Sequence, residues 1–137
     1  MHSILVKDYM DNDPHAVLVT ANVRDVVVSL LKAGVIGCPV IDEKENVVGF
    51  VSEQDCIKEM LNDAFYCEEP PAVSAVMHSD VLTVSPDTSI VEVAQTMLAH
   101  KPKNYPVVDD GKLIGLINRS LILKAIVEND EDCYIHH

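Results

Sequence analysis

The chain has 137 residues, of which 22 are acidic and 10 basic, so its formal net charge is −12 at pH 7. Nucleic acids and anionic membranes attract proteins through clustered Lys and Arg, and this charge balance therefore argues against either as a partner. No run of about 18 apolar residues is present for a transmembrane helix, and the first residues lack the pattern of a signal peptide, so we expect a cytoplasmic protein.

The first half of the sequence predicts three short strands and two helices. In chain order, these are a strand over 17–20, a helix over 23–33, strands over 39–41 and 47–51, and a helix from Ser52 to about residue 62. Asn22 is a good N-cap for the first helix, and Gly34 is a good C-terminal stop. A polar turn at 43–46 joins the second strand to the third.

The second half predicts the same elements after a linker at 65–72, where consecutive prolines cannot continue a helix. They are a strand over 82–84, a helix over 89–100, strands over 105–108 and 113–117, and a helix over 121–127. Asp110 and Gly111 form a typical two-residue hairpin turn between the last two strands. Residues 130–137 are expected to form a flexible acidic tail.

The two halves are diverged copies of one unit. A shift of 67 residues places 6–42 on 73–109 without a gap, with nine identities in 37 pairs, where chance would give about three. We therefore predict an α+β fold made of two β-α-β-β-α repeats, 1–64 and 73–129. A repeat of about 60 residues buries little surface alone, so we expect the two to pack about a pseudo-twofold axis with a cleft between them.

The cysteines show no CxxC spacing, and Cys38 and Cys56 lie in hydrophobic stretches that suit small buried thiols. We expect reduced, unpaired thiols. The C-terminal Cys133, His136 and His137 could chelate a metal, but a frayed tail offers no further groups to orient the ligands. The sequence therefore predicts neither a bound metal nor a cofactor.

The ordered motifs of the two copies resemble those of the CBS domain, named after cystathionine beta-synthase. The first copy reads CPVID and then VVGFVSEQD at 47–55, and the second reads YPVVD and then LIGLINRSL at 113–121. Each copy also begins with a V-x-x-x-M element. The resemblance implies a tandem CBS pair, or Bateman module, whose clefts bind an adenosine-containing ligand such as AMP, ADP, ATP or S-adenosylmethionine.

In this family, the motif Gly-hydrophobic-x-Ser/Thr-x-x-Asp places a carboxylate where it accepts hydrogen bonds from the ribose hydroxyls. The match at 49–55 implies that Asp55 binds ribose and that Ser52 faces the phosphate or sugar. The same two residues also fit a capping box at a helix start. The second copy has Leu121 at the acidic position, and a leucine accepts no hydrogen bond, so we expect at most one adenosyl site.

The resemblance implies further contacts. The base is expected beside the apolar side chains and backbone of the strand Ile36, Gly37, Cys38 and Pro39. Gly37 either allows the ligand to approach the backbone or only makes a turn. Phosphates need cations from the opposite half, for which Arg119, Lys101 and Lys103 are candidates, although each also suits a solvated surface.

Catalytic motifs of the GxSxG, P-loop and HExxH types are absent, and we expect no enzyme. The leading hypothesis is a stand-alone regulatory protein that binds an adenosine-containing ligand and signals to an unknown target protein. The alternative is a ligand-free protein–protein interaction module. Apolar positions on the predicted helices indicate a homodimer; they are Val26, Val27, Leu30, Leu31, Ile57, Met60 and Leu61.

Overall fold

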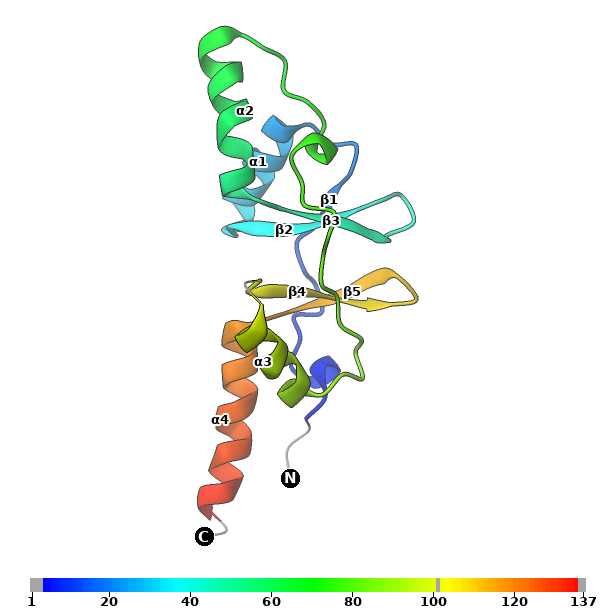
Figure 1. Ribbon diagram of the computed structural model, residues 1–137, viewed down its shortest axis with the longest axis vertical. Coiled ribbons are helices and arrows are strands. Elements are labelled where there is room, and N and C mark those ends of the chain that lie inside the picture. The colour runs from blue at the N-terminus through cyan, green and yellow to red at the C-terminus, as the bar shows by residue number, and fades with distance from the viewer. Residues whose placement is uncertain (1–3, 101, 136–137) are drawn as a thin grey trace. The chain divides into compact units, whose positions relative to one another are not determined.

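The computed structural model describes residues 4–100 and 102–135, with side chains up to residue 130 (Figure 1). Four α-helices, five strands and two 3-10 turns occur in this part of the chain. In order they are η1 Val6–Asp8, β1 Val17–Leu18, α1 Val23–Ala33, β2 Gly37–Ile41, β3 Val47–Ser52, α2 Glu53–Tyr66, η2 Val73–Ala75, α3 Ile90–Ala99, β4 Asn104–Asp109, β5 Lys112–Asn118 and α4 Arg119–Ile135.

Local capping signals place α1 where the sequence predicted it. The side chain of Asn22 accepts a hydrogen bond from the backbone N–H of Asp25 at 2.8 Å, which satisfies one free donor at the start of α1. Gly34 ends the helix in the left-handed conformation at φ 69°, and its N–H bonds back to carbonyls of the last turn. The predicted helix over 23–33 is therefore confirmed.

The strands form two sheets. β1 runs parallel to β2, and β2 runs antiparallel to β3, whereas β4 and β5 form an antiparallel pair. The strand predicted at 82–84 is wrong, since only Val84 makes a bridge, to Val107. The pairing ends there because Thr88 Oγ1 accepts the N–H of Ser85, and Pro86, the next residue, has no N–H to donate.

The second repeat is one residue shorter than the first in the turn between the paired strands, since Asp42 corresponds to Asp109 at a shift of 67 residues and Asp55 corresponds to Leu121 at a shift of 66. In the first repeat, Asp42 Oδ1 accepts the N–H groups of Lys44 and Asn46, both at 2.9 Å. In the second repeat, Asp110 and Gly111 have φ of 53° and 80°. Two positive φ values in succession are typical of a type I′ turn, so the predicted two-residue hairpin is confirmed.

Two helices are longer than the sequence analysis predicted. α2 continues to Tyr66 and ends at Cys67, which adopts the left-handed conformation at φ 53°. α4 continues to Ile135, so residues 130–135, expected as part of a flexible tail, are helical. The segment after Val127 contains neither Gly nor Pro, so no residue in it stops the helix.

The two compact units of the structure differ from the two sequence repeats. One unit contains His15–Val81, and the other contains the residues up to Pro14 together with those from Leu82 onward. The V-x-x-x-M element at the start of each repeat thus belongs to the unit that holds the rest of the other repeat. Val73 is fully buried in the core of the unit 15–81, and Val6 is fully buried in the core of the other unit.

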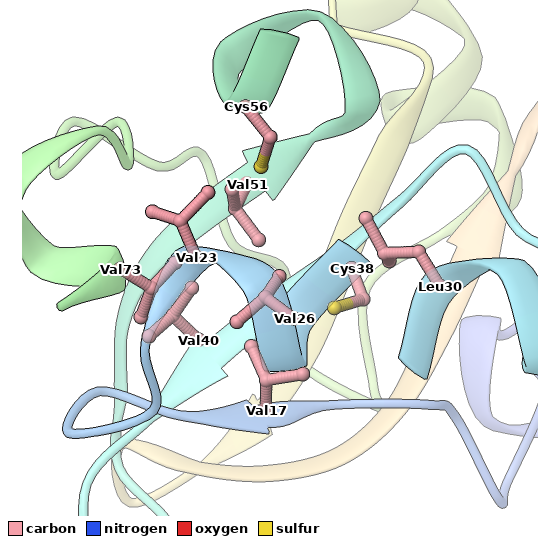
Figure 2. Packing of buried hydrophobic residues seen from close by; sticks show 9 residues of the cluster. All are labelled: Val17, Val23, Val26, Leu30, Cys38, Val40, Val51, Cys56 and Val73. Carbon is pink, nitrogen blue, oxygen red and sulfur yellow. The ribbon is translucent and has the colours of Figure 1, made fainter. Parts of the chain in front are cut away.

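Figure 2 shows the core of the unit 15–81, where α1, β2, β3 and η2 meet around aliphatic side chains. Cys38 and Cys56 are buried among them, as predicted for small structural thiols. Burial, with a smaller contribution from Cys56, raises the pKa of Cys38 to about 12. Cys38 is therefore a protonated thiol at neutral pH and a poor nucleophile.

Gly49 and Gly115 hold corresponding positions in β3 and β5, where the V-x-x-x-M element of each unit crosses the strand. A Cβ at Gly49 would lie 2.9 Å from the carbonyl oxygen of His78, and a Cβ at Gly115 would lie 2.9 Å from that of Asp11. Backbone atoms cannot yield as a flexible side chain does. Glycine is therefore required for the close approach of two backbones.

We expect Gly115→Ala to reduce the free energy of unfolding by about 1–3 kcal/mol, because the added methyl group overpacks this crossing. Urea denaturation measures the effect, and Gly49→Ala should give a similar loss. Gly34→Asn is the control, since a Cβ at Gly34 meets nothing within 4 Å and Asn tolerates the left-handed conformation. A loss for Gly115→Ala no larger than that of the control would contradict the prediction.

Candidate ligand-binding site

The start of α2 is a complete capping box, built from Ser52 and Asp55. The Ser52 hydroxyl accepts the N–H of Asp55 at 3.4 Å, and Asp55 Oδ2 accepts the N–H of Ser52 at 2.9 Å. The hydroxyl of Ser52 also donates to Asp55 Oδ2, at 2.9 Å. Both residues thus stabilise the helix start, and the bonds hold the carboxylate in one orientation.

The second oxygen of this carboxylate contacts a histidine that the sequence analysis did not select. His78 Nε2 lies 2.9 Å from Asp55 Oδ1. The side chain of Asp55 is 14% exposed, whereas that of His78 is 70% exposed. His78 is placed by two backbone hydrogen bonds with Phe50 of β3, of 2.8 and 2.9 Å.

Of the strand predicted to contact the base, the first two residues lie next to the helix start. Gly37 pairs with Ser52 across β2 and β3, and the carbonyl of Ile36 accepts the N–H of Glu53 at 2.9 Å. The side chain of Ile36 is exposed. A Cβ at Gly37 would lie 2.9 Å from the carbonyl oxygen of Val51, so packing within the sheet already accounts for this glycine.

Cys38 and Pro39, the other two residues of that strand, are buried in the core. Their side chains do not reach the surface and could meet a ligand only through the backbone. Among the candidate cations, Arg119 at the start of α4 and Lys103 before β4 are both exposed and belong to the other compact unit. Lys101 lies outside the described residues.

The corresponding helix start of the second repeat has the cap without the acid. Asn118 Oδ1 accepts the N–H of Leu121 at 2.9 Å, which replaces the first half of the capping box. Leu121 packs against the hydrophobic core of its unit. This position therefore has a structural role and lacks an acceptor for ribose.

A groove with apolar walls lies between α1 and α2 on the unit 15–81. Its volume is about 420 Å³, and it is lined by Val27, Leu31, Glu53, Cys56, Ile57, Met60, Leu61 and Ala64. Leu31, Ile57 and Leu61 are each at least half exposed. The sequence analysis had selected seven helix positions as an uncovered apolar face, and the exposure of these three side chains agrees with it. Val26 and Leu30 were selected wrongly, because they are 0% and 1% exposed and pack in the core of the unit itself.

No helix within residues 4–100 and 102–135 has the length and apolar character needed to cross a membrane. In the same part of the chain, no three side chains of His, Cys, Asp or Glu are grouped as metal ligands. The side chains of the C-terminal candidates Cys133, His136 and His137 lie outside the described ones.

The motifs around both helix starts match those of a known family. Residues 6–62 and 73–128 each match the CBS domain profile. The chain belongs to the CBS domain family. It contains a tandem pair of these domains, and the α+β fold of two repeats predicted from the sequence is confirmed.

Solved structures of CBS pairs agree with the fold. A crystal structure of CBSX2 in complex with AMP has a TM-score of 0.81 and 30% identity, and the match covers 93% of this chain and 99% of that one. CBSX2 is a CBS-pair protein from Arabidopsis thaliana. AcuB from Vibrio cholerae has a TM-score of 0.78 and 29% identity over 93% of each chain.

Among curated relatives, an A-adding tRNA nucleotidyltransferase from Aquifex aeolicus is 29% identical over 126 residues. The match covers 92% of this chain and 15% of the enzyme. The protein MJ1225 of Methanocaldococcus jannaschii is 22% identical, with 42% of its length covered. This chain thus spans less than half the length of either relative.

Proposed function

We propose that the protein is a regulatory module that binds AMP or another adenosine-containing ligand at the start of α2, with Asp55 as the acceptor for the ribose hydroxyls. Support comes from CBSX2, the relative whose crystal structure is a complex with AMP. The single observation that carries the proposal is the carboxylate of Asp55, which is mostly buried and fixed by two hydrogen bonds from Ser52.

The fixed orientation of the Asp55 carboxylate is the physical reason to expect that it binds a ligand. A charged acceptor that is already oriented loses little conformational entropy when a ligand binds, and hydrogen bonds to a carboxylate are stronger than those between neutral groups. The capping box and the binding site are then two uses of one side chain. The capping contacts occupy Oδ2, whereas Oδ1 is the oxygen that a ligand can reach by displacing an exposed side chain.

We further propose a binding role rather than catalysis, with output through an unidentified target protein and a cytoplasmic location. The nucleotidyltransferase activity of the Aquifex relative belongs to a protein of which this chain matches only 15%. The exposed apolar face of α1 and α2 supports a homodimer. A second candidate function is a ligand-free interaction module, which the leucine at position 121 favours, since one of the two helix starts has lost its acid.

Thermal unfolding with a ligand panel tests the proposal. We expect AMP, ADP, ATP or S-adenosylmethionine to raise the midpoint by several degrees, because a ligand at about 100 times its Kd adds about 2.7 kcal/mol. Because Asp55 is proposed to bind the ribose hydroxyls, 2′-deoxy-AMP is the matched control for AMP and should give a smaller shift. No shift with any adenosine-containing ligand at millimolar concentration would favour the interaction module.

A further inference from the structure

The contact between His78 and Asp55 joins two segments that are 23 residues apart in the unit 15–81. A carboxylate only accepts hydrogen bonds, with about four lone-pair sites on its two oxygens. Oδ2 already accepts two bonds from Ser52, and Oδ1 faces Nε2 of His78. One acceptor site therefore remains free, whereas a vicinal diol donates two hydrogen bonds.

From this mismatch we infer that His78 is a positioning residue that competes with the ribose for Asp55 Oδ1 and leaves it when the ligand binds. The inference rests on the proposed function, since it concerns the same site. The imidazole can leave at small cost because its own side chain is 70% exposed, so the released ring returns to water while the carboxylate keeps its bonds from Ser52. His78 thus lowers the affinity of the site for the ligand, although it makes no contact in the ligand-bound site.

The other repeat lacks both partners of this pair. Leu121 replaces Asp55, and Asp11 replaces His78 at the corresponding place after the V-x-x-x-M element. The backbone arrangement is nevertheless the same, since Asp11 bridges to Leu116 as His78 bridges to Phe50. The contact is therefore not a requirement of the fold, because the same crossing forms without it.

Calorimetry with AMP tests the inference. We expect His78→Ala to bind AMP about two- to fivefold more tightly than wild type, because the variant removes the group that competes with the ribose for Asp55 Oδ1. His78→Gln keeps a neutral donor at this position, so its gain in affinity should be smaller. His100→Gln, on the other unit, is the control and should bind AMP as wild type does.

A measurement without ligand tests the contact itself. We expect His78→Ala to lower the Tm in the wild-type background but not in the Asp55→Asn background, because the carboxylate that the imidazole contacts is then absent. Equal Tm changes in both backgrounds would overturn the inference, as would AMP binding by His78→Ala that is no tighter than that of wild type. Failure of every variant to bind AMP, with the Tm coupling present, would instead overturn the proposed function.

Discussion

Asp55→Ala is expected to weaken AMP binding at least about tenfold, which corresponds to ~1.4 kcal/mol. A buried ribose diol without its acceptor loses about 1–3 kcal/mol. The variant also loses the carboxylate half of the capping box, at a cost of about 1 kcal/mol in folding stability. Isothermal calorimetry on folded protein measures the affinity, and denaturant unfolding measures the stability separately.

Ser52→Ala is the matched control for this prediction. It removes the hydroxyl of the capping box, and with it one of the two bonds that orient Asp55, but it keeps the carboxylate and the bond from the backbone N–H. It should reduce stability by about 1 kcal/mol and weaken AMP binding less than Asp55→Ala does. Asp55→Asn retains the shape and removes the charge, and should bind weakly. Equal losses of affinity in Ser52→Ala and Asp55→Ala would show that AMP binding depends on the capped helix start and not on the carboxylate as an acceptor for ribose. Two equivalent sites per chain would contradict the role of Leu121.

The double variant Ile57→Glu and Leu61→Glu is expected to convert a homodimer into a monomer. These side chains are 50% and 51% exposed on α2, and Leu31 is 67% exposed on the neighbouring α1. Burying an aliphatic side chain contributes about 1.5–3 kcal/mol, and a twofold interface uses each position twice. Buried carboxylates add a desolvation penalty. The dimer dissociation constant should therefore rise at least about 100-fold.

Light scattering coupled to gel filtration at tens of micromolar measures the oligomeric state. Leu18→Glu is the matched control, because Leu18 is 48% exposed and lies on β1, away from the apolar groove. It should leave the dimer intact. A monomeric wild type at this concentration, or a dimer that survives both glutamates, would contradict the assignment of this face.

Signals that act over a few residues were predictable from the sequence. Asn22 and Gly34 fix the ends of α1, and Asp110 with Gly111 fixes the hairpin, because each makes its contacts within one turn of the chain. The internal repeat fixed the order of the strands and helices. Burial of Cys38 and Cys56 followed from the apolar residues around them.

Contacts between distant segments were not predictable in the same way. His78 reaches Asp55 only because the segment after η2 docks across β3, and no spacing in the sequence indicates this. The failed strand at 82–84 depends on the Ser85 and Thr88 turn, which competes for a backbone donor. The Ser52 and Asp55 pair supported two interpretations from the sequence, and the structure shows that both residues form the capping box.

The exchange of V-x-x-x-M elements between the repeats has a consequence for the order of folding during synthesis. The unit His15–Val81 is continuous, so it can acquire its whole core, Val73 included, once that stretch has left the ribosome. The residues up to Pro14 belong to a core that includes Ile122 and Ala125, which are made more than a hundred residues later. Since domains generally fold as units during synthesis, the segment that ends at Pro14 should find its place in a core only after the whole unit 15–81 has been made.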